Sequence, residues 1–235
     1  MEIKAVLFDL DGTLLPMDQD VFVKTYFKLL AVKLAPLGYD PEQLFKSIWA
    51  GVTAMVKNDG SCTNEEAFWK VFTGIYGEES IKDKPVIDGF YSNEFDGAKV
   101  TCGFNPAARE VIDLVKAKGL TAILATNPIF PAVATRKRMD WAGLTPKDFV
   151  LYTTYENSCH SKPNPKYYLD ILEKVGYKPE ECLMVGNDVT EDMIAETLGM
   201  KVFLLTDCMI NKEEKDISVY AHGGFEELKE YISCC

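Results

Sequence analysis

Two aspartates near the N-terminus have the type and spacing needed for covalent acid–base chemistry. Asp9 and Asp11 directly follow the apolar run 5–8 and precede Gly12. Residues two apart in extended backbone project to the same side, and two crowded carboxylates resist joint ionisation unless a cation lies between them. We therefore expect a bound metal, with one carboxylate ionised as a nucleophile and the other protonated as an acid. The simpler alternative is an acidic turn after an edge strand.

Polar residues with chemical potential also follow two later segments. Thr126 and Asn127 come after an apolar run and precede a predicted helix, so these side chains and the helix's free N–H groups can hold phosphate oxygens. Lys162 lies in a loop stiffened by Pro163 and Pro165, which makes it a fixed positive charge. Read separately, these residues are equally consistent with a helix cap and a solvated lysine.

A third stretch, residues 186–192, is an acidic loop after the apolar run 182–185. Mg²⁺ prefers hard oxygen ligands and keeps several waters, so a carboxylate in this loop is a candidate ligand. The alternative is an acidic loop that compensates a helix dipole.

The motif Asp9-Leu10-Asp11-Gly12-Thr13, followed in order by the three later stretches, resembles the haloacid dehalogenase superfamily, in its phosphatase branch. The resemblance implies that Asp9 is the nucleophile and Asp11 the general acid and base. It also implies that Thr126 and Asn127 bind the phosphoryl group and that Lys162 balances charge.

The last motif departs from the family, which commonly has Gly-Asp where this chain has Gly186-Asn187-Asp188. The choice of ligand between Asn187 and Asp188 is therefore open. We expect Mg²⁺ to be held by Asp9, Asp11 and Asp188, because a carboxylate binds Mg²⁺ more strongly than an amide does. Asp192 is expected to hold Lys162 or a metal-bound water.

The function implied by the resemblance is that of a Mg²⁺-dependent phosphohydrolase, acting on a small phosphate monoester through an aspartyl-phosphate intermediate. Asp11 argues against a dehalogenase, because a halide leaving group needs no proton. A sugar-phosphate mutase of the same fold and a non-catalytic binding protein remain alternatives.

Helical patterns dominate residues 17–101 and include two N-cap signatures. Asp40 precedes Pro41, and Thr63 with Glu66 forms a capping box. We expect four helices in this segment, the last and weakest over residues 86–95, forming a small all-helical domain with its own core. This segment is similar to the family's helical cap, which closes over the site and selects the substrate.

Residues 1–16 and 102–235 are predicted to form a Rossmann-like α/β core, a parallel sheet with helices on both faces. Helices are expected near 105–119, 130–142, 165–175 and 190–198, and strands near 120–125, 149–152, 182–185 and 202–205. In such a sheet the functional groups gather at the carboxyl ends of the strands.

Composition limits the partners and the compartment. The net charge of −11 argues against binding to nucleic acid or an anionic membrane. No apolar run approaches the ~18 residues that a membrane span needs, and acidic residues stand where a signal peptide would be basic and apolar. The seven scattered cysteines predict reduced, mostly buried thiols, and Cys159-His160 lacks a partner pair for zinc. We expect a cytoplasmic protein that binds a small phosphorylated metabolite, as a monomer or homodimer.

Overall fold

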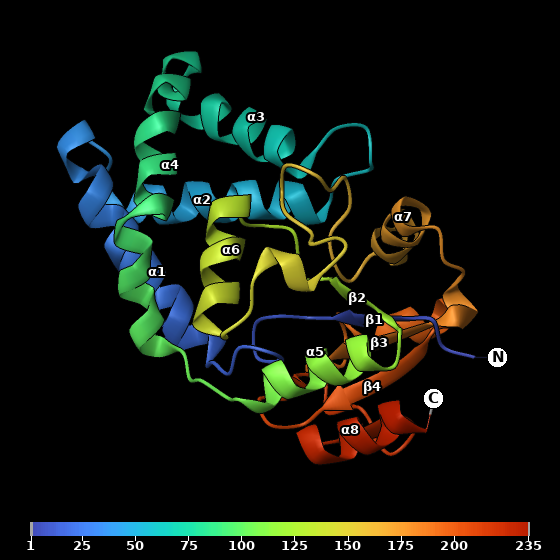
Figure 1. Cartoon of the computed structure of the whole chain (residues 1–235). Helices are drawn as coiled ribbons and strands as arrows, with labels where there is room; N and C mark the ends of the chain where they lie inside the picture. The colour runs from blue at the N-terminus through green and yellow to red at the C-terminus, as the bar shows by residue number, and fades with distance from the viewer. Residues whose placement is uncertain (1, 235) are drawn as a thin grey trace.

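The computed structural model describes residues 2–234 and is built on a five-stranded parallel sheet (Figure 1). The strand order is β2-β1-β3-β4-β5, so β1 lies between β2 and β3. The strands are β1 (Ala5–Phe8), β2 (Thr121–Leu124), β3 (Cys182–Gly186), β4 (Lys201–Leu205) and β5 (Ala221–Gly223). The predicted Rossmann-like parallel sheet is confirmed.

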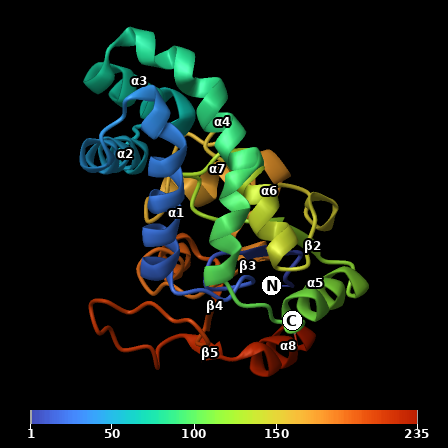
Figure 2. The same cartoon turned by 90° about the vertical axis from the view of Figure 1, so that its left-hand side faces the viewer.

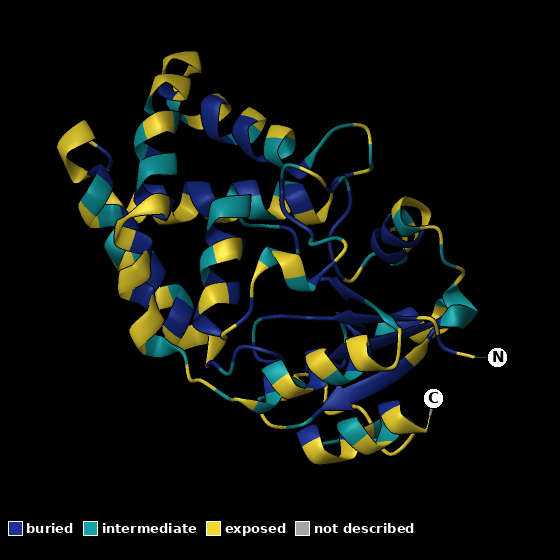
Figure 3. Cartoon of the chain, in the orientation of Figure 1, coloured by how far each residue is buried: buried dark blue, intermediate teal, exposed yellow. Residues whose placement is uncertain are grey.

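Helices cover both faces of the sheet. On one face, α5 (Ala107–Ala117) and α8 (Phe225–Ser233) share a buried apolar cluster with Val6 and Phe8 of β1. On the other, α7 (Pro165–Val175) shares a second cluster with Ala5 and Leu7 of the same strand. Because successive strand residues point to opposite faces and both faces are covered, β1 is apolar throughout, and β1 to β4 are largely buried (Figure 3).

A layer of helices stands beyond the carboxyl ends of the strands (Figures 1 and 2). It consists of α1 (Gln19–Leu34), α2 (Pro41–Val56), α3 (Asn64–Tyr76) and α4 (Lys84–Ser92). The side chain of Asp40 accepts from Gln43 N, and Thr63 and Glu66 form the reciprocal capping box, as predicted. The fourth helix begins and ends earlier than expected, and a 3-10 helix follows it.

The remaining helices belong to the connections. They are α6 (Ala132–Trp141) and the 3-10 helices Ala35–Leu37, Glu78–Asp83, Glu94–Thr101, Pro146–Asp148, Pro179–Glu181 and Met193–Leu198.

The helical layer shares its apolar interior with α6 and the sheet. A continuous cluster of buried residues joins them, with Phe95 stacked on Trp141 at 5.2 Å and Phe22 against Phe130 at 6.3 Å between ring centroids. Fully buried Asn64 at the start of α3 adds hydrogen bonds to Pro128 O and Ser161 Oγ. The domain boundaries predicted at 16/17 and 101/102 stay a prediction.

Two predicted elements take a different form. Residues 149–152 are not a strand: they make two backbone hydrogen bonds to β2 and one isolated bridge, and Thr153 N–H adds a last bond to Leu124 O. Residues 190–198 are helical only from Met193, where a 3-10 helix follows a turn in which the side chain of Asp188 accepts from the N–H groups of Thr190 and Glu191. Apolar periodicity does not report this local turn.

The sequence pattern does not predict β5 or α8. β5 is only three residues, Ala-His-Gly, and has no apolar run.

None of the described helices is long and apolar enough to cross a membrane. Within residues 2–234 every cysteine is a free thiol, but among them Cys182 alone is buried, so the prediction of mostly buried thiols is wrong. Cys235 lies outside the described residues.

Candidate active site

Asp9 lies at the carboxyl end of β1, in the middle of the sheet. Its backbone N–H donates to Val185 O of β3, which continues the strand pairing into the site. The side chain is buried, with Lys162 Nζ 2.8 Å from Oδ1 and Thr13 Oγ1 3.2 Å from Oδ2. Lys162 is the firmer of these contacts, because the single hydrogen of the Thr13 hydroxyl is shared between Asp9 Oδ2 and Asn187 Oδ1.

Lys162 is buried and is held between two carboxylates. Its ammonium group donates to Asp192 Oδ1 at 2.6 Å as well as to Asp9. Burial alone would lower the pKa of Lys162, but Asp192 and Asp9 hold that pKa well above its usual value. Lys162 is therefore a fixed cation beside Asp9, and the expected contact with Asp192 is confirmed.

Asp11 has a different cation. The guanidinium of Arg138, on α6, donates to Asp11 Oδ2, while Asp11 Oδ1 is buried without a hydrogen-bond partner. Burial raises the pKa of Asp11 above its usual value, and the charge of Arg138 opposes this rise. One aspartate thus faces a lysine, and the other faces an arginine.

This arrangement corrects one step of the sequence argument. We expected the two carboxylates to need a shared metal because they would repel each other. Instead, Lys162 and Arg138 supply a separate positive charge to Asp9 and Asp11. Repulsion between the aspartates therefore gives no independent argument for a metal.

The loop after β3 separates the roles of Asn187 and Asp188. Asn187 Oδ1 accepts from Thr13 Oγ1 at 3.0 Å, and its Nδ2 donates to Cys208 O at 2.7 Å, so the amide ties three segments together. Gly12 allows this close approach: its φ is 84°, and a Cβ there would lie 2.3 Å from Asn187 Nδ2. Asp188 uses Oδ1 to accept from two backbone N–H groups, which leaves Oδ2 as the candidate ligand atom.

Thr126 and Asn127 follow β2 and line the same cavity as the aspartates. The carbonyl of Thr126 is fixed by the hydroxyls of Thr153, at 2.6 Å, and Tyr167, at 2.8 Å. Asn127 Nδ2 donates to Glu191 Oε2 at 3.0 Å, and Asn127 Oδ1 is buried without a partner.

The next helix, α6, does not begin directly after Asn127 as expected. Its first N–H, that of Ala132, is taken by both carboxylate oxygens of Glu156, at 2.9 and 3.0 Å. The N–H of Ala132 is therefore not free to bind a phosphate. This contradicts the expectation of free N–H groups at the start of this helix.

Five of the predicted site residues line one cavity of about 270 Å³. These residues are Asp9, Asp11, Thr126, Asn127 and Asp188. Lys162 is not among the lining residues and reaches Asp9 from behind. Side chains of the helical layer, Trp49 among them, form the opposite wall.

The donors in this cavity are compatible with Mg²⁺, although no side-chain cluster is preassembled. Within residues 2–234, no group of three Asp, Glu, His or Cys side chains is arranged to hold a metal ion. Mg²⁺ needs only one or two carboxylates when water and substrate phosphate complete its octahedron. Asp9, Asp188 and the unpartnered Oδ1 of Asp11 are hard oxygen donors on the cavity wall, so the residues fit such an ion. The predicted three-carboxylate ligand set stays a prediction.

Two residues at the site are absent from the sequence-based set. Arg138 could have been found from helical phase, because Ala134, Arg138 and Ala142 fall four apart on the buried face of α6. A charged side chain on such a face needs a buried partner. Glu191 lines the cavity, and burial raises its pKa to about 8, but its sequence context resembles that of any acidic loop residue.

Known proteins resemble this chain over most of its length. A family model described as haloacid dehalogenase-like hydrolase matches residues 3–195. The phosphoglycolate phosphatase of Aquifex aeolicus is 25% identical over 201 residues, which cover 86% of this chain and 84% of that protein. The glyceraldehyde 3-phosphate phosphatase of Methanothermobacter thermautotrophicus is 27% identical over 241 residues, covering 98% and 100%.

Solved structures share the fold over nearly the full length. A hydrolase of this family from Bacillus subtilis, crystallised with magnesium bound, superposes with a TM-score of 0.58 at 18% identity. The match covers 99% of both chains, and at this identity it shows the fold alone.

Proposed function

The chain belongs to the haloacid dehalogenase-like hydrolase family, and from this premise we propose that it hydrolyses a small phosphate monoester with Asp9 as the nucleophile. The observation that carries the proposal is the unequal setting of two aspartates on one cavity. Asp9 is held by Lys162 and Thr13, whereas Asp11 is held by Arg138 and keeps one carboxylate oxygen without a partner. Relatives named as phosphatases match along most of the chain and support the same reaction class.

In the first half-reaction, a carboxylate oxygen of Asp9 attacks phosphorus in line with the ester oxygen. The P–O bond to the organic group breaks, and Asp11 gives its proton to the departing oxygen. The raised pKa of Asp11 suits it to carry that proton. The products are the free alcohol and a phosphoryl group on Asp9.

In the second half-reaction, Asp11, now ionised, takes a proton from water. The resulting nucleophile attacks the phosphoryl group, and Asp9 and inorganic phosphate are released. The Lys162 ammonium balances negative charge beside Asp9 through both steps. In this proposal Thr126 and Asn127, which line the cavity after β2, orient phosphoryl oxygens.

We propose Mg²⁺ as the cofactor, held by Asp9 and Asp188 with participation of Asp11. When bound, it would neutralise charge on the phosphoryl oxygens. We choose Asp188 over Asn187 for this ligand set because a carboxylate binds Mg²⁺ more strongly than an amide oxygen, and the Asn187 amide is already bonded to Thr13 and Cys208.

The direct test is release of p-nitrophenol from p-nitrophenyl phosphate with and without Mg²⁺. We expect turnover by the natural chain, loss after chelation, and none by Asp9→Asn, while Asp20→Asn on the exposed start of α1 behaves as the natural chain does. Absence of turnover across a panel of phosphate monoesters with Mg²⁺ would favour a non-catalytic binding protein. Activity only with a sugar bisphosphate activator would instead indicate a mutase.

A further inference from the structure

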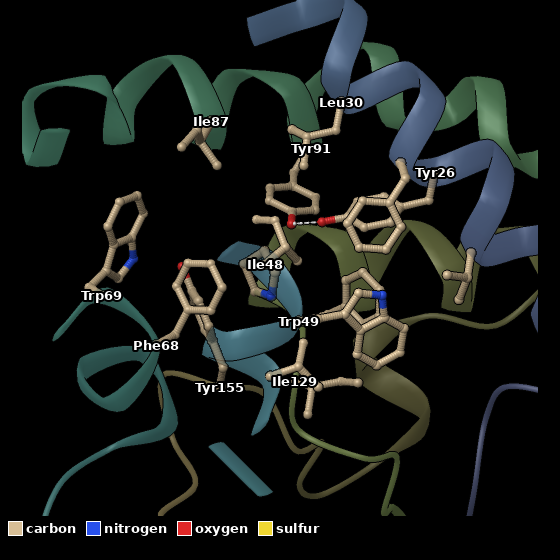
Figure 4. Close-up of a pocket in the computed structure, with 15 residues that line it drawn as sticks. Tyr26, Leu30, Ile48, Trp49, Phe68, Trp69, Ile87, Tyr91, Ile129 and Tyr155 are labelled. Carbon is tan, nitrogen blue, oxygen red and sulfur yellow. Dashed lines mark hydrogen bonds between the residues drawn. The ribbon is translucent and has the colours of Figure 1, made fainter. Parts of the chain in front are cut away.

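A second cavity, which we call the apolar chamber, lies inside the helical layer beside the catalytic cavity. Side chains of α1, α2, α3 and α4 converge on it, among them Tyr26, Ile48, Phe68 and Tyr91 (Figure 4). All fifteen residues that line it are aliphatic, aromatic or proline. Its volume of about 80 Å³ exceeds the ~10–15 Å³ needed for one water, so it is more than a packing gap.

The apolar chamber opens from the wall of the catalytic cavity. The residues that line both are Val23, Trp49, Val52, Ile129 and Phe130. Phe130 lies three positions after Asn127, so the motif that is placed to orient the phosphoryl group runs directly into the chamber wall. Trp49 and Phe130 therefore line a route from the phosphoryl position beside Asp9 toward the chamber.

No positive side chain serves the organic part of the substrate. The residues lining the two cavities include five carboxylates and no lysine, arginine or histidine. Arg138 is the nearest candidate, but its guanidinium lies 4.4 Å from the Phe130 ring centroid and is fully buried. Its nitrogens donate to Asp11 Oδ2, Thr135 Oγ1 and Ala134 O.

A second anionic group on the substrate would therefore be desolvated in this chamber without a cationic partner; the buried donor left unpaired in the wall is the neutral Nε1 of Trp69. Burying an unpaired charge is strongly unfavourable, and the carboxylates of the catalytic cavity add repulsion. An apolar group would instead gain from burial and fill an otherwise empty space. The hydroxyls of Tyr26 and Tyr91 in the wall are hydrogen-bonded to each other, 2.7 Å apart.

We propose that the organic part of the substrate is a compact, uncharged apolar group that occupies this chamber, and that the enzyme discriminates against monoesters carrying a carboxylate there. The inference rests on the proposed phosphatase function and deepens it. It would distinguish this chain from its phosphoglycolate phosphatase relatives. Their named substrate carries a carboxylate where the proposed substrate carries an apolar group.

The test compares isobutyl phosphate, phosphoglycolate and methyl phosphate by release of inorganic phosphate. The first two have nearly the same shape and differ in charge, and methyl phosphate lacks the group that would enter the chamber. We expect kcat/KM for isobutyl phosphate to exceed that for the other two by roughly 10- to 200-fold, the range set by small changes in an apolar pocket. Equal or better hydrolysis of phosphoglycolate overturns the inference.

Variants that fill the chamber test whether the preference for isobutyl phosphate depends on this space. Ile48 and Ile87 line the apolar chamber but not the catalytic cavity, so Ile48→Trp and Ile87→Phe should bring isobutyl phosphate down to the level of methyl phosphate. Val32→Trp, at an exposed position of α1, is the matched control and should change neither. Folded variants that keep the full preference would overturn the inference.

The comparison of esters on the natural chain decides the matter even if a filled variant does not fold. Failure of the phosphatase assignment is distinguishable, because then p-nitrophenyl phosphate and all three alkyl esters would release no phosphate.

Discussion

Arg138 donates to Oδ2 of Asp11 although 127 positions separate the two residues. The arginine has no solvent exposure, and its charge lies between Asp11 and the ring of Phe130. Since the other carboxylate oxygen is buried without a partner, this contact alone sets the direction in which Asp11 presents that oxygen to the cavity. Arg138 is thus a positioning residue for the proposed acid and base.

Replacing Arg138 by Met should lower kcat with little change in KM. Acid–base assistance contributes roughly 10²–10⁴-fold, and a misdirected Asp11 would lose part of it. The double variant Arg138→Met with Asp11→Asn should have a kcat only slightly below that of Asp11→Asn alone, because both substitutions act through the same group. Arg136→Met, exposed on the same helix, serves as control. Additive losses in the double variant would show that Arg138 acts elsewhere.

The two aspartates should differ in covalent chemistry. Asp9→Asn removes the nucleophile, so no phosphoryl adduct should form. Asp11→Asn keeps the nucleophile but slows both half-reactions by ~10²–10⁴-fold. With an aryl phosphate, whose leaving group needs little protonation, this variant should accumulate one phosphoryl group on Asp9. Intact-protein mass spectrometry after acid quench checks this, and an adduct mapped to a serine or histidine would identify a different nucleophile.

Asp188→Ala should weaken Mg²⁺ binding more than Asn187→Ala does. Asp188 has one carboxylate oxygen left for a ligand, whereas the amide of Asn187 already bridges Thr13 and Cys208. Asn187→Ala should instead lower the free energy of unfolding, by about 1–3 kcal/mol, because it leaves buried groups unpaired. Calorimetric Mg²⁺ titration and urea unfolding measure the two effects. The reverse order of Mg²⁺ affinities would make Asn187 the ligand.

A polar cluster far from the site gives a prediction of stability against pH. Asp148 accepts from Arg109 at 2.6 and 2.8 Å and from Lys116 at 2.5 Å. The bonds from Arg109, ahead of those from Lys116, hold the pKa of Asp148 well below its usual range despite partial burial. A depressed pKa means that this stabilisation is complete above pH ~3.9 and is lost as pH falls through the folded-state value.

Asp148→Asn should therefore lower the free energy of unfolding at pH 7 by about 1–3 kcal/mol, the range for hydrogen bonds to charged groups. The difference from the natural chain should shrink steadily below pH ~4. Urea unfolding at several pH values measures it. Asp113→Asn removes a more exposed partner of Arg109 at 3.4 Å and should change stability by less than about 1 kcal/mol. A pH-independent effect at Asp148 would contradict the ionic explanation.

Many features of this molecule depend on residues that are close together in the chain, and the sequence by itself determines those features. Apolar runs ending in polar residues located β1, β2 and β3 and the functional loops after them, because parallel strands place their carboxyl ends at one edge. The caps at Asp40 and Thr63 are contacts within three residues and were predictable for the same reason. Lys162 beside Asp9 followed from family motif order, and its contact with Asp192 was expected as well.

Tertiary structure decided everything that depends on which side chains meet across the chain. Helical phase could place Arg138 on a buried face, but only packing of α6 against the loop after β1 makes Asp11 its partner. The occupied amide of Asn187 likewise depends on Thr13 and Cys208 arriving from two other segments. The apolar chamber exists because four helices and the loop after β2 leave a space between them, and spacing along one helix carries no information about such a gap.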